Sequence, residues 1–257
     1  MPIPPLVGMV HLGPLPGSPR FSGDFEGVLA DAASDAATLA QAGFGAIMLE
    51  NFGDAPFYAD DVPKVTIAAL TTAVNTVYRA SRLPIGVNVL RNDAIGALSV
   101  AAATAASFIR VNVLSGTMYT DQGPIVGRAA DVARLRQRIC PDVEVMADVF
   151  VKHAVAPAGL SLVDATHDLV ERSGADAVVV SGRGTGAPTS VDDLSTVVAA
   201  SDLPVFVGSG VTRDTVGAIL DIASGVIVGT DIKLDGVETN PFDPVRAEAI
   251  VTATTRR

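Results

Sequence analysis

The stretch that decides the fold is Pro204-Val-Phe-Val-Gly-Ser-Gly-Val-Thr-Arg213, and a similar stretch, Gly225-Val-Ile-Val-Gly-Thr-Asp231, follows it. Each is a run of apolar residues that ends in glycine and a hydroxyl side chain. In a parallel α/β sheet, such a run predicts a buried strand with a tight turn at its C-terminal end. Glycine lets backbone N–H groups approach an anion, and a following helix adds the positive end of its dipole. The residues expected to bind a phosphate here are Gly208, Ser209, Gly210, Gly229 and Thr230.

The length and composition favour one large hydrophobic core. A chain of 257 residues fits a single (β/α)8 barrel, for which about 250 residues is typical. Hydrophobic residues make up 49% of the chain and aromatic residues 5%. This is typical of alanine-rich helices packed around Val- and Ile-rich parallel strands. We therefore expect one domain over residues 1–257.

The net charge and the single cysteine limit the expected binding partners and the expected cellular compartment. A net charge of −10 argues against binding to nucleic acid or to an anionic membrane surface, but a small site can still be locally positive. Cys140 has no internal partner for a disulfide, which is compatible with a reducing cytoplasm. The sequence lacks a signal peptide and an uninterrupted apolar run of about 18 residues. We expect a soluble, cytoplasmic homo-oligomer without an integral membrane segment.

Strand and helix patterns alternate strictly along the chain, which predicts a parallel sheet. An open doubly wound sheet is the competitor, but the first strand is not followed by the Gly-x-Gly-x-x-Gly turn that would support it. Eight strand–helix units favour an α/β fold closed as a TIM barrel. The expected strands cover residues 6–11, 44–50, 84–90, 108–113, 143–149, 176–181, 205–208 and 226–229. The expected helices cover residues 25–41, 62–82, 93–106, 128–139, 162–172, 191–200, 212–222 and 244–254.

The connections are of unequal length. The helix-to-strand connections are short, whereas the loops after the first, second, fourth and fifth strands are several times longer. Long loops without structure of their own are usually functional. All of these long loops lie at the carboxyl ends of the strands, where barrel enzymes keep their active sites.

Six apolar strands in succession end in a polar side chain: His11, Glu50, Asn88, Asn112, Asp148 and Ser181. Side chains alternate along a strand, so Arg110 shares a face with Asn112. Isolated buried charges are costly, and they persist when they are paired or functional. One or two such residues could be structural, but six at one end of a barrel indicate a site.

Several chemistries fit this set of residues. His11, Glu50 and Asp148 are candidates for acid–base catalysis, and they could also converge on a divalent metal ion, although there is no linear ligand motif. Lys152 follows Asp148 by four residues, and this pair offers proton transfer or Schiff-base chemistry. A loop position is unusual for a Schiff-base lysine, so contact with phosphate or substrate is favoured. The segment Gly182-Arg-Gly-Thr-Gly186 follows Ser181, and we add Ser181 and Gly182 to the phosphate site.

Several segments resemble the BtpA/SgcQ family, and the similarity runs from about residue 3 to residue 254. They are Gly8-Met-Val-His-Leu-Gly-Pro-Leu-Pro-Gly17, Glu50-Asn51, Val87-Asn-Val-Leu-Arg-Asn-Asp93, Phe108-Ile-Arg-Val-Asn112, Thr120-Asp-Gln-Gly123, Ala147-Asp-Val-Phe-Val-Lys-His-Ala154 and Gly208-Ser-Gly-Val-Thr212. The resemblance implies a phosphate-binding (β/α)8 barrel. The cyanobacterial branch of the family is named for photosystem I accumulation, and other members are described as sugar-processing or nucleoside-related enzymes. The resemblance implies a fold and a site, without a settled catalytic assignment.

Taken together, these patterns predict an enzyme that isomerises, epimerises or cleaves a phosphorylated small molecule, and a sugar phosphate is the favoured class. His11, Glu50 and Asp148 would carry the acid–base chemistry, and Lys152 would stabilise developing negative charge. Asn88, Arg110 and Asn112 would polarise a carbonyl or orient hydroxyls. One alternative is a non-catalytic assembly factor, which would need an exposed apolar or charged patch outside the barrel mouth. The other is a phosphate- or nucleotide-dependent transferase, for instance one that uses a prenyl diphosphate.

Overall fold

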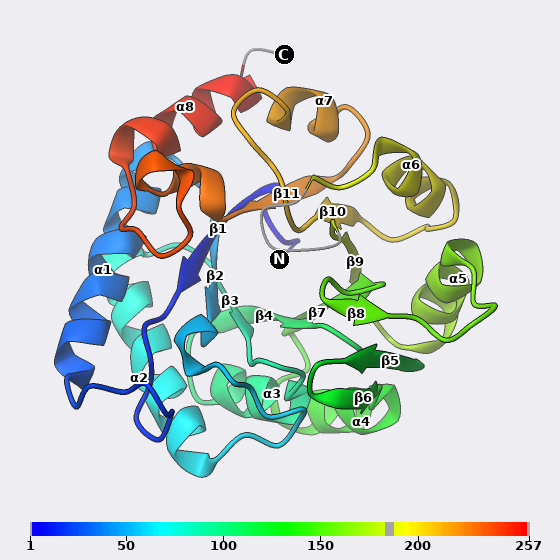
Figure 1. Ribbon diagram of the computed structural model, residues 1–257, viewed down its shortest axis with the longest axis horizontal. Helices are drawn as coiled ribbons and strands as arrows, with labels where there is room; N and C mark the ends of the chain where they lie inside the picture. The colour runs from blue at the N-terminus through cyan, green and yellow to red at the C-terminus, as the bar shows by residue number, and fades with distance from the viewer. Residues whose placement is uncertain (1, 183–187, 256–257) are drawn as a thin grey trace.

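Eight parallel strands close into a barrel whose order is β1-β11-β10-β9-β7-β4-β3-β2. The computed structural model describes residues 2–182 and 188–255. Consecutive barrel strands are neighbours, as Figure 1 shows at the centre of the molecule. The strands are β1 (Leu6–His11), β2 (Ala46–Glu50), β3 (Ile85–Asn88), β4 (Ala106–Val111), β7 (Glu144–Val149), β9 (Ala177–Val180), β10 (Val205–Val207) and β11 (Gly225–Val228). The predicted (β/α)8 barrel is confirmed.

The helices form a ring outside the strands (Figure 1). The first helix illustrates why they begin and end where they do: Asp24 accepts a hydrogen bond from the Gly27 N–H at 2.8 Å, and Gly43 ends the helix with a φ of 98°, a conformation that favours glycine. The helices are α1 (Phe25–Ala42), α2 (Lys64–Ser81), α3 (Ala94–Ala102), α4 (Ala129–Ile139), α5 (Leu162–Arg172), α6 (Val191–Ala199), α7 (Val216–Leu220) and α8 (Pro244–Thr255). None of those described is long and apolar enough to cross a membrane.

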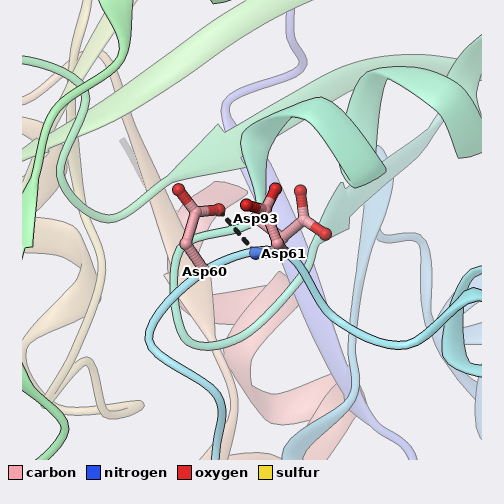
Figure 2. Close-up of side chains that lie close together, drawn as sticks. All are labelled: Asp60, Asp61 and Asp93. Carbon is pink, nitrogen blue, oxygen red and sulfur yellow. Dashed lines mark hydrogen bonds between the residues drawn. The ribbon is translucent and has the colours of Figure 1, made fainter.

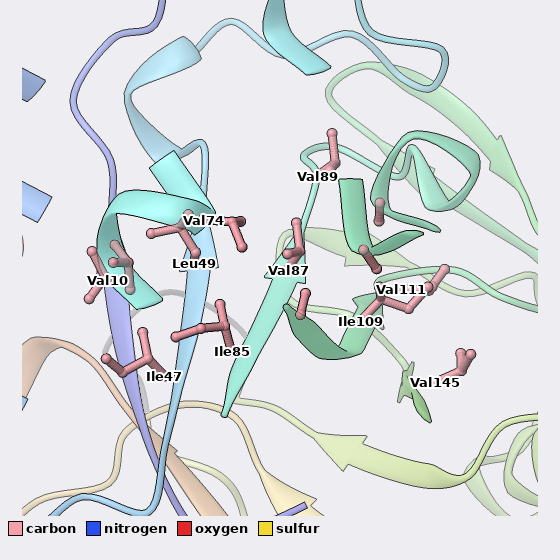
Figure 3. Packing of buried hydrophobic residues seen from close by; sticks show 14 of the residues in the cluster. Val10, Ile47, Leu49, Val74, Ile85, Val87, Val89, Ile109, Val111 and Val145 are labelled. Carbon is pink, nitrogen blue, oxygen red and sulfur yellow. The ribbon is translucent and has the colours of Figure 1, made fainter. Parts of the chain in front are cut away.

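Alternation along the strands divides the core into two shells. Outward-facing residues such as Leu49, Val87 and Ile109 pack against the helices, as Figure 3 shows. The inward-facing apolar residues fill the barrel itself: Val7, Met9, Ala46, Met48, Phe108, Met146, Ala177, Val179, Phe206 and Ile227. The barrel interior is therefore solid below its carboxyl end.

Two expectations about the elements were wrong. The loop expected after the fourth strand contains a hairpin, β5 (Thr117–Thr120) and β6 (Gly123–Val126), and β8 (Ala154–Val155) extends it to a three-stranded sheet. Isolated short strands of this kind give too few residues for a periodic pattern. The helix expected over 212–222 is only α7, with five residues, because the chain leaving β10 first makes a turn in which the Thr215 and Val216 N–H groups donate to Thr212 O.

Candidate functional site

A row of polar side chains crosses the barrel interior at the carboxyl ends of the first four strands. His11 pairs in register with Glu50, Glu50 with Asn88, and Asn88 with Arg110. Because these positions share the inward-facing alternation, their side chains lie directly above the apolar filling of the barrel. The predicted gathering of polar strand ends is therefore what the strand register produces.

Within this row, Glu50 is held between two neighbours. The Asn88 side-chain amide donates to Glu50 Oε2 at 2.6 Å, and His11 Nε2 lies 3.8 Å from Glu50 Oε1. Glu50 is only 2% exposed, yet it also lines a cavity at the barrel mouth. A carboxylate in this position has a fixed direction and can reach a bound molecule.

Arg110 and Asp148 form a second unit next to this row. Two guanidinium nitrogens of Arg110 donate to the two carboxylate oxygens of Asp148, at 2.7 and 2.8 Å. Arg110 also donates to Ser181 Oγ at 3.3 Å, and the Asn112 amide donates to Asp148 at 3.4 Å. Both charged side chains are fully buried. The guanidinium and the carboxylate therefore form a paired, hydrogen-bonded unit, which offsets the cost of burying the two charges.

Burial sets the charge state of the groups around Glu50. It lowers the pKa of His11 from 6.5 to about 4, an effect that the nearby Glu50 opposes. The imidazole is therefore neutral at pH 7. Burial also lowers the pKa of Lys152, again with Glu50 opposing. In His11 the Nδ1 atom is buried and has no hydrogen-bond partner among the residues the structure describes.

The glycine turns after β10 and β11 line a cavity of about 210 Å³. Gly210 has a φ of +69°, a backbone conformation that disfavours other residues. Ser209 Oγ accepts a hydrogen bond from the Gly182 N–H at 2.6 Å, which joins the turns after β9 and β10. All predicted phosphate residues except Ser181 and Gly182 line this cavity: Gly208, Ser209, Gly210, Gly229 and Thr230. His11 and Lys152 line it as well.

The prediction that an α-helix dipole lies directly behind these turns is wrong. The short helix α7 begins at Val216, six residues after Gly210. β11 is followed directly by a 3-10 turn, η2 (Thr230–Ile232), with Gly229 at its N-cap. An anion here would depend on local N–H groups and nearby cations more than on an α-helix axis. Residues 183–187, which cover most of the segment Gly182-Arg-Gly-Thr-Gly186, lie outside the described residues.

A second cavity, of about 390 Å³, lies at the same end of the barrel, and Lys152 lines both cavities. The chain after β2 and β3 contributes apolar side chains, and the β5–β6 turn contributes Gln122. Its lining includes Glu50, Phe52, Phe57, Leu90, Asn112 and Gln122. Phe52 packs on His11 with 4.6 Å between the ring centroids. The two cavities together extend from the glycine turns to the Glu50 row.

The three metal-ligand candidates do not gather into one ligand set. Among the described residues, the group whose oxygen atoms all lie within 4.8 Å of one another is Asp60, Asp61 and Asp93, which Figure 2 shows side by side. Arg128 contacts Asp60 at 3.4 Å and Asp61 at 3.2 Å. Asp93 accepts from the Gly96 N–H at 2.6 Å and so caps α3. These carboxylates already have cationic and N–H partners.

Of the three predicted metal ligands, Asp148 is the one that the geometry does not favour. His11 and Glu50 are neighbours, but both oxygens of Asp148 accept from Arg110. A metal ion bound by all three would have to compete with a buried guanidinium. Only His11 and Glu50 offer atoms toward the cavities.

Some residues at the mouth were missed by the sequence analysis. Arg91 is 4% exposed and donates to the Lys152 carbonyl at 2.6 Å, which fixes the loop that contains the lysine. Glu238 is half-buried on the chain that follows β11, and burial raises its pKa while Lys152 opposes that shift. The resemblance segment 87–93 already contained Arg91, whereas nothing in the local sequence of Glu238 signals that its loop folds back toward Lys152.

Comparison with known proteins identifies the family. The BtpA family model matches residues 3–256. The chain belongs to the BtpA family. A BtpA-family relative, an uncharacterized protein of Thermococcus kodakarensis, is 51% identical over 96% of this chain and 94% of its own length. The photosystem I biogenesis protein BtpA of Synechocystis is 42% identical over 97% of this chain and 87% of its own length.

Solved structures agree with the fold of this BtpA-family chain. The thiamine phosphate pyrophosphorylase from Pyrococcus furiosus superposes with a TM-score of 0.60, covering 98% of this chain and 95% of that one, at 14% sequence identity. At this identity the likeness concerns the fold alone. The chain is therefore a BtpA-family protein with a TIM-barrel fold.

Proposed function

We propose that the chain is an enzyme that acts on a sugar phosphate by acid–base chemistry, as an isomerase, an epimerase or a lyase. The observation that carries this proposal is that Lys152 lines both the glycine-turn cavity and the cavity of Glu50. A phosphate bound at Ser209 and Gly210 would place the rest of the molecule past Lys152 and toward Glu50. Enzymes with a similar fold, such as the orotidine 5′-phosphate decarboxylase of Pyrococcus horikoshii, are consistent with a phosphorylated substrate on this scaffold.

In this proposal, Glu50 is the general base and Lys152 the electrostatic partner. Asn88 fixes the direction of the Glu50 carboxylate through its 2.6 Å hydrogen bond, so the base can remove a proton from a carbon or hydroxyl of the substrate. Negative charge then develops on the substrate oxygen, where the Lys152 ammonium stabilises it. His11 is neutral, because burial lowers its pKa to about 4, and its unpartnered Nδ1 can bind or relay a proton.

Arg110, Asp148 and Asn112 take supporting roles in the same proposal. Asp148 accepts both of its short hydrogen bonds from Arg110, so we assign acid–base chemistry to Glu50 and His11 ahead of Asp148. Arg110 holds Ser181 in place beside the phosphate turns. Asn112 lines the Glu50 cavity, and we assign it the role of orienting substrate hydroxyls.

The test begins with a thermal-shift screen of the full chain against inorganic phosphate and a panel of sugar phosphates, with and without Mg²⁺ and Zn²⁺. A stabilised hit names the ligand class, and turnover of that hit is then measured. We expect Glu50→Gln to reduce turnover by about 10²–10⁴-fold, the usual contribution of a general base, with binding changed little. The matched control is Glu248→Gln on the exposed face of α8, which should leave turnover unchanged. Unchanged turnover in both variants would contradict the assignment.

A non-catalytic assembly role is the second candidate, and one observation favours it. The small sheet presents an exposed apolar row: Tyr119 is paired in register with Pro124 and with Val155. Tyr119 and Val155 are 53% and 68% exposed. The relative named as a photosystem I biogenesis protein makes this role worth separating from catalysis. The alternative of a transferase has no comparable observation in its favour.

The two candidates make opposite predictions in a deletion strain complemented with variants. An assembly factor requires the apolar row, so Tyr119→Lys combined with Val155→Lys would abolish complementation while Glu50→Gln would not. An enzyme gives the reverse pattern. Thermal shifts with the ligand found above check that the double variant still folds.

A further inference from the structure

The cavity beside Glu50 has a chemical character that a sugar alone does not explain. Its walls include the side chains of Phe52, Phe57 and Leu90, which come from the chain that follows β2 and β3. Aromatic and aliphatic walls of this kind favour a planar apolar ring over a hydroxylated chain. The cavity volume of about 390 Å³ lies in the range of small-molecule sites.

Two of the residues that line this cavity each carry an amide oxygen that lacks a donor. Asn112 Oδ1 and Gln122 Oε1 are buried, and neither accepts a hydrogen bond from any residue that the structure describes. Their residues come from different parts of the barrel mouth: Asn112 directly follows β4, and Gln122 lies in the β5–β6 turn. Leaving a buried acceptor unpaired is unfavourable, so both oxygens favour a ligand that brings donors.

The orientation of both amides is fixed by carboxylates. The Asn112 amide nitrogen donates to Asp148 Oδ2 at 3.4 Å, and the Gln122 amide nitrogen donates to Asp121 Oδ2 at 2.5 Å. Exchanging nitrogen and oxygen in either side chain would place an oxygen against a carboxylate, which is repulsive. The oxygens, and not the NH₂ groups, are therefore the atoms that remain for a ligand.

We propose that this cavity binds a nitrogen heterocycle that offers at least two N–H donors to Asn112 Oδ1 and Gln122 Oε1, with its ring against Phe52 and Phe57. The inference rests on the proposed function in one respect: it places the phosphate of the same molecule in the glycine-turn cavity, on the other side of Lys152. The substrate class is then a phosphorylated sugar that carries a nitrogenous base, rather than a free sugar phosphate.

The test is isothermal titration calorimetry of the full chain with ribose 5-phosphate and with the ribonucleoside monophosphates GMP, AMP, CMP and UMP. GMP, AMP and CMP have bases with an exocyclic amino group, so we expect at least one of them to bind tenfold or more tightly than ribose 5-phosphate. UMP is the matched control, because its base has a single N–H between two carbonyl oxygens. We expect UMP to gain at most twofold over ribose 5-phosphate.

The variant Gln122→Met removes the acceptor while nearly keeping the side-chain volume. It should weaken the preferred nucleotide about tenfold and leave ribose 5-phosphate within twofold. Gln122→Ala at the same turn is the second variant, with circular dichroism to confirm folding. The inference is overturned if no amino-bearing nucleotide exceeds ribose 5-phosphate, if UMP binds equally well, or if both variants weaken all ligands alike.

Failure of this inference and failure of the proposed function give different results. If ribose 5-phosphate binds but the bases add nothing, the phosphate site stands and the heterocycle is wrong. If the nucleosides guanosine, adenosine or cytidine bind in a Gln122-dependent way while ribose 5-phosphate does not bind, the base cavity stands and the phosphate site is wrong.

Discussion

The two sides of the barrel mouth recognise ligands by different means. From β1 to β4 and β7, the strands deliver charged and amide side chains whose directions are fixed by hydrogen bonds between them. From β10 and β11, the chain delivers glycine turns with few side-chain atoms, and Gly208 has no room for a Cβ, which would lie 2.7 Å from Val179 Cγ1. Buried charges need paired partners, whereas exposed N–H groups do not. The first side therefore depends on paired side chains, and the second depends on backbone groups and on glycines such as Gly208 and Gly210.

The largest expected effect is on the side of the paired side chains. Asp148→Asn leaves Arg110 as a buried charge without its bidentate partner, and we expect the free energy of unfolding to fall by about 3–5 kcal/mol. Urea unfolding measures it. Replacing both residues together, Arg110→Met with Asp148→Leu, removes the charges as well and should recover most of that loss. A loss below about 1 kcal/mol in Asp148→Asn would mean that the pair is not a structural unit.

The next effect is pH-dependent. Burial lowers the pKa of His11 from 6.5 to about 4. Between these values the unfolded chain binds a proton at His11 that the folded chain does not, so acid favours unfolding. The cost is absent above pH 6.5 and reaches about 3 kcal/mol below pH 4. Denaturant unfolding at several pH values should show this term for the natural chain. It should be missing in His11→Gln; parallel curves for the two proteins would contradict the shift.

The smallest effect is expected on the glycine side. A Cβ at Gly229 would lie 3.4 Å from Met9 Cβ and 3.5 Å from His11 Cε1, which are ordinary contact distances, and Gly229 lines the cavity. Gly229→Ala should therefore fold normally, but weaken the binding of inorganic phosphate about tenfold, or about 1.4 kcal/mol. Calorimetry measures the affinity. The matched control is Gly217→Ala in α7, where an added Cβ meets only Ala253 O at 3.9 Å. Equal affinities in both variants would place the anion elsewhere.

The contrast between the two sides also explains what the sequence could predict. The barrel and its inward-facing polar row follow from alternation along apolar strands, and this is why His11, Glu50, Asn88 and Arg110 were placed correctly at one end. Strand alternation is a local property, and parallel strands bring their carboxyl ends together.

Pairing and long-range contacts could not be predicted in the same way. The sequence does not indicate that Asp148 is bonded to Arg110, because the two lie 38 residues apart. The β5–β6 hairpin, which places Gln122 in the cavity wall, is too short for a periodic pattern. The short α7 also differs from the expected helix, since a run of helix-compatible residues does not reveal the turn around Thr212.

The apolar filling of the barrel below the polar row determines how a ligand can enter and leave the site. Phe108, Met146 and Phe206 close the barrel from beneath, so a small molecule cannot pass along the axis. Anything that enters must leave by the opening through which it came. If the reaction cleaves its substrate, both fragments leave through the opening that admits the next substrate molecule. Product inhibition by the phosphorylated fragment should then be competitive with substrate.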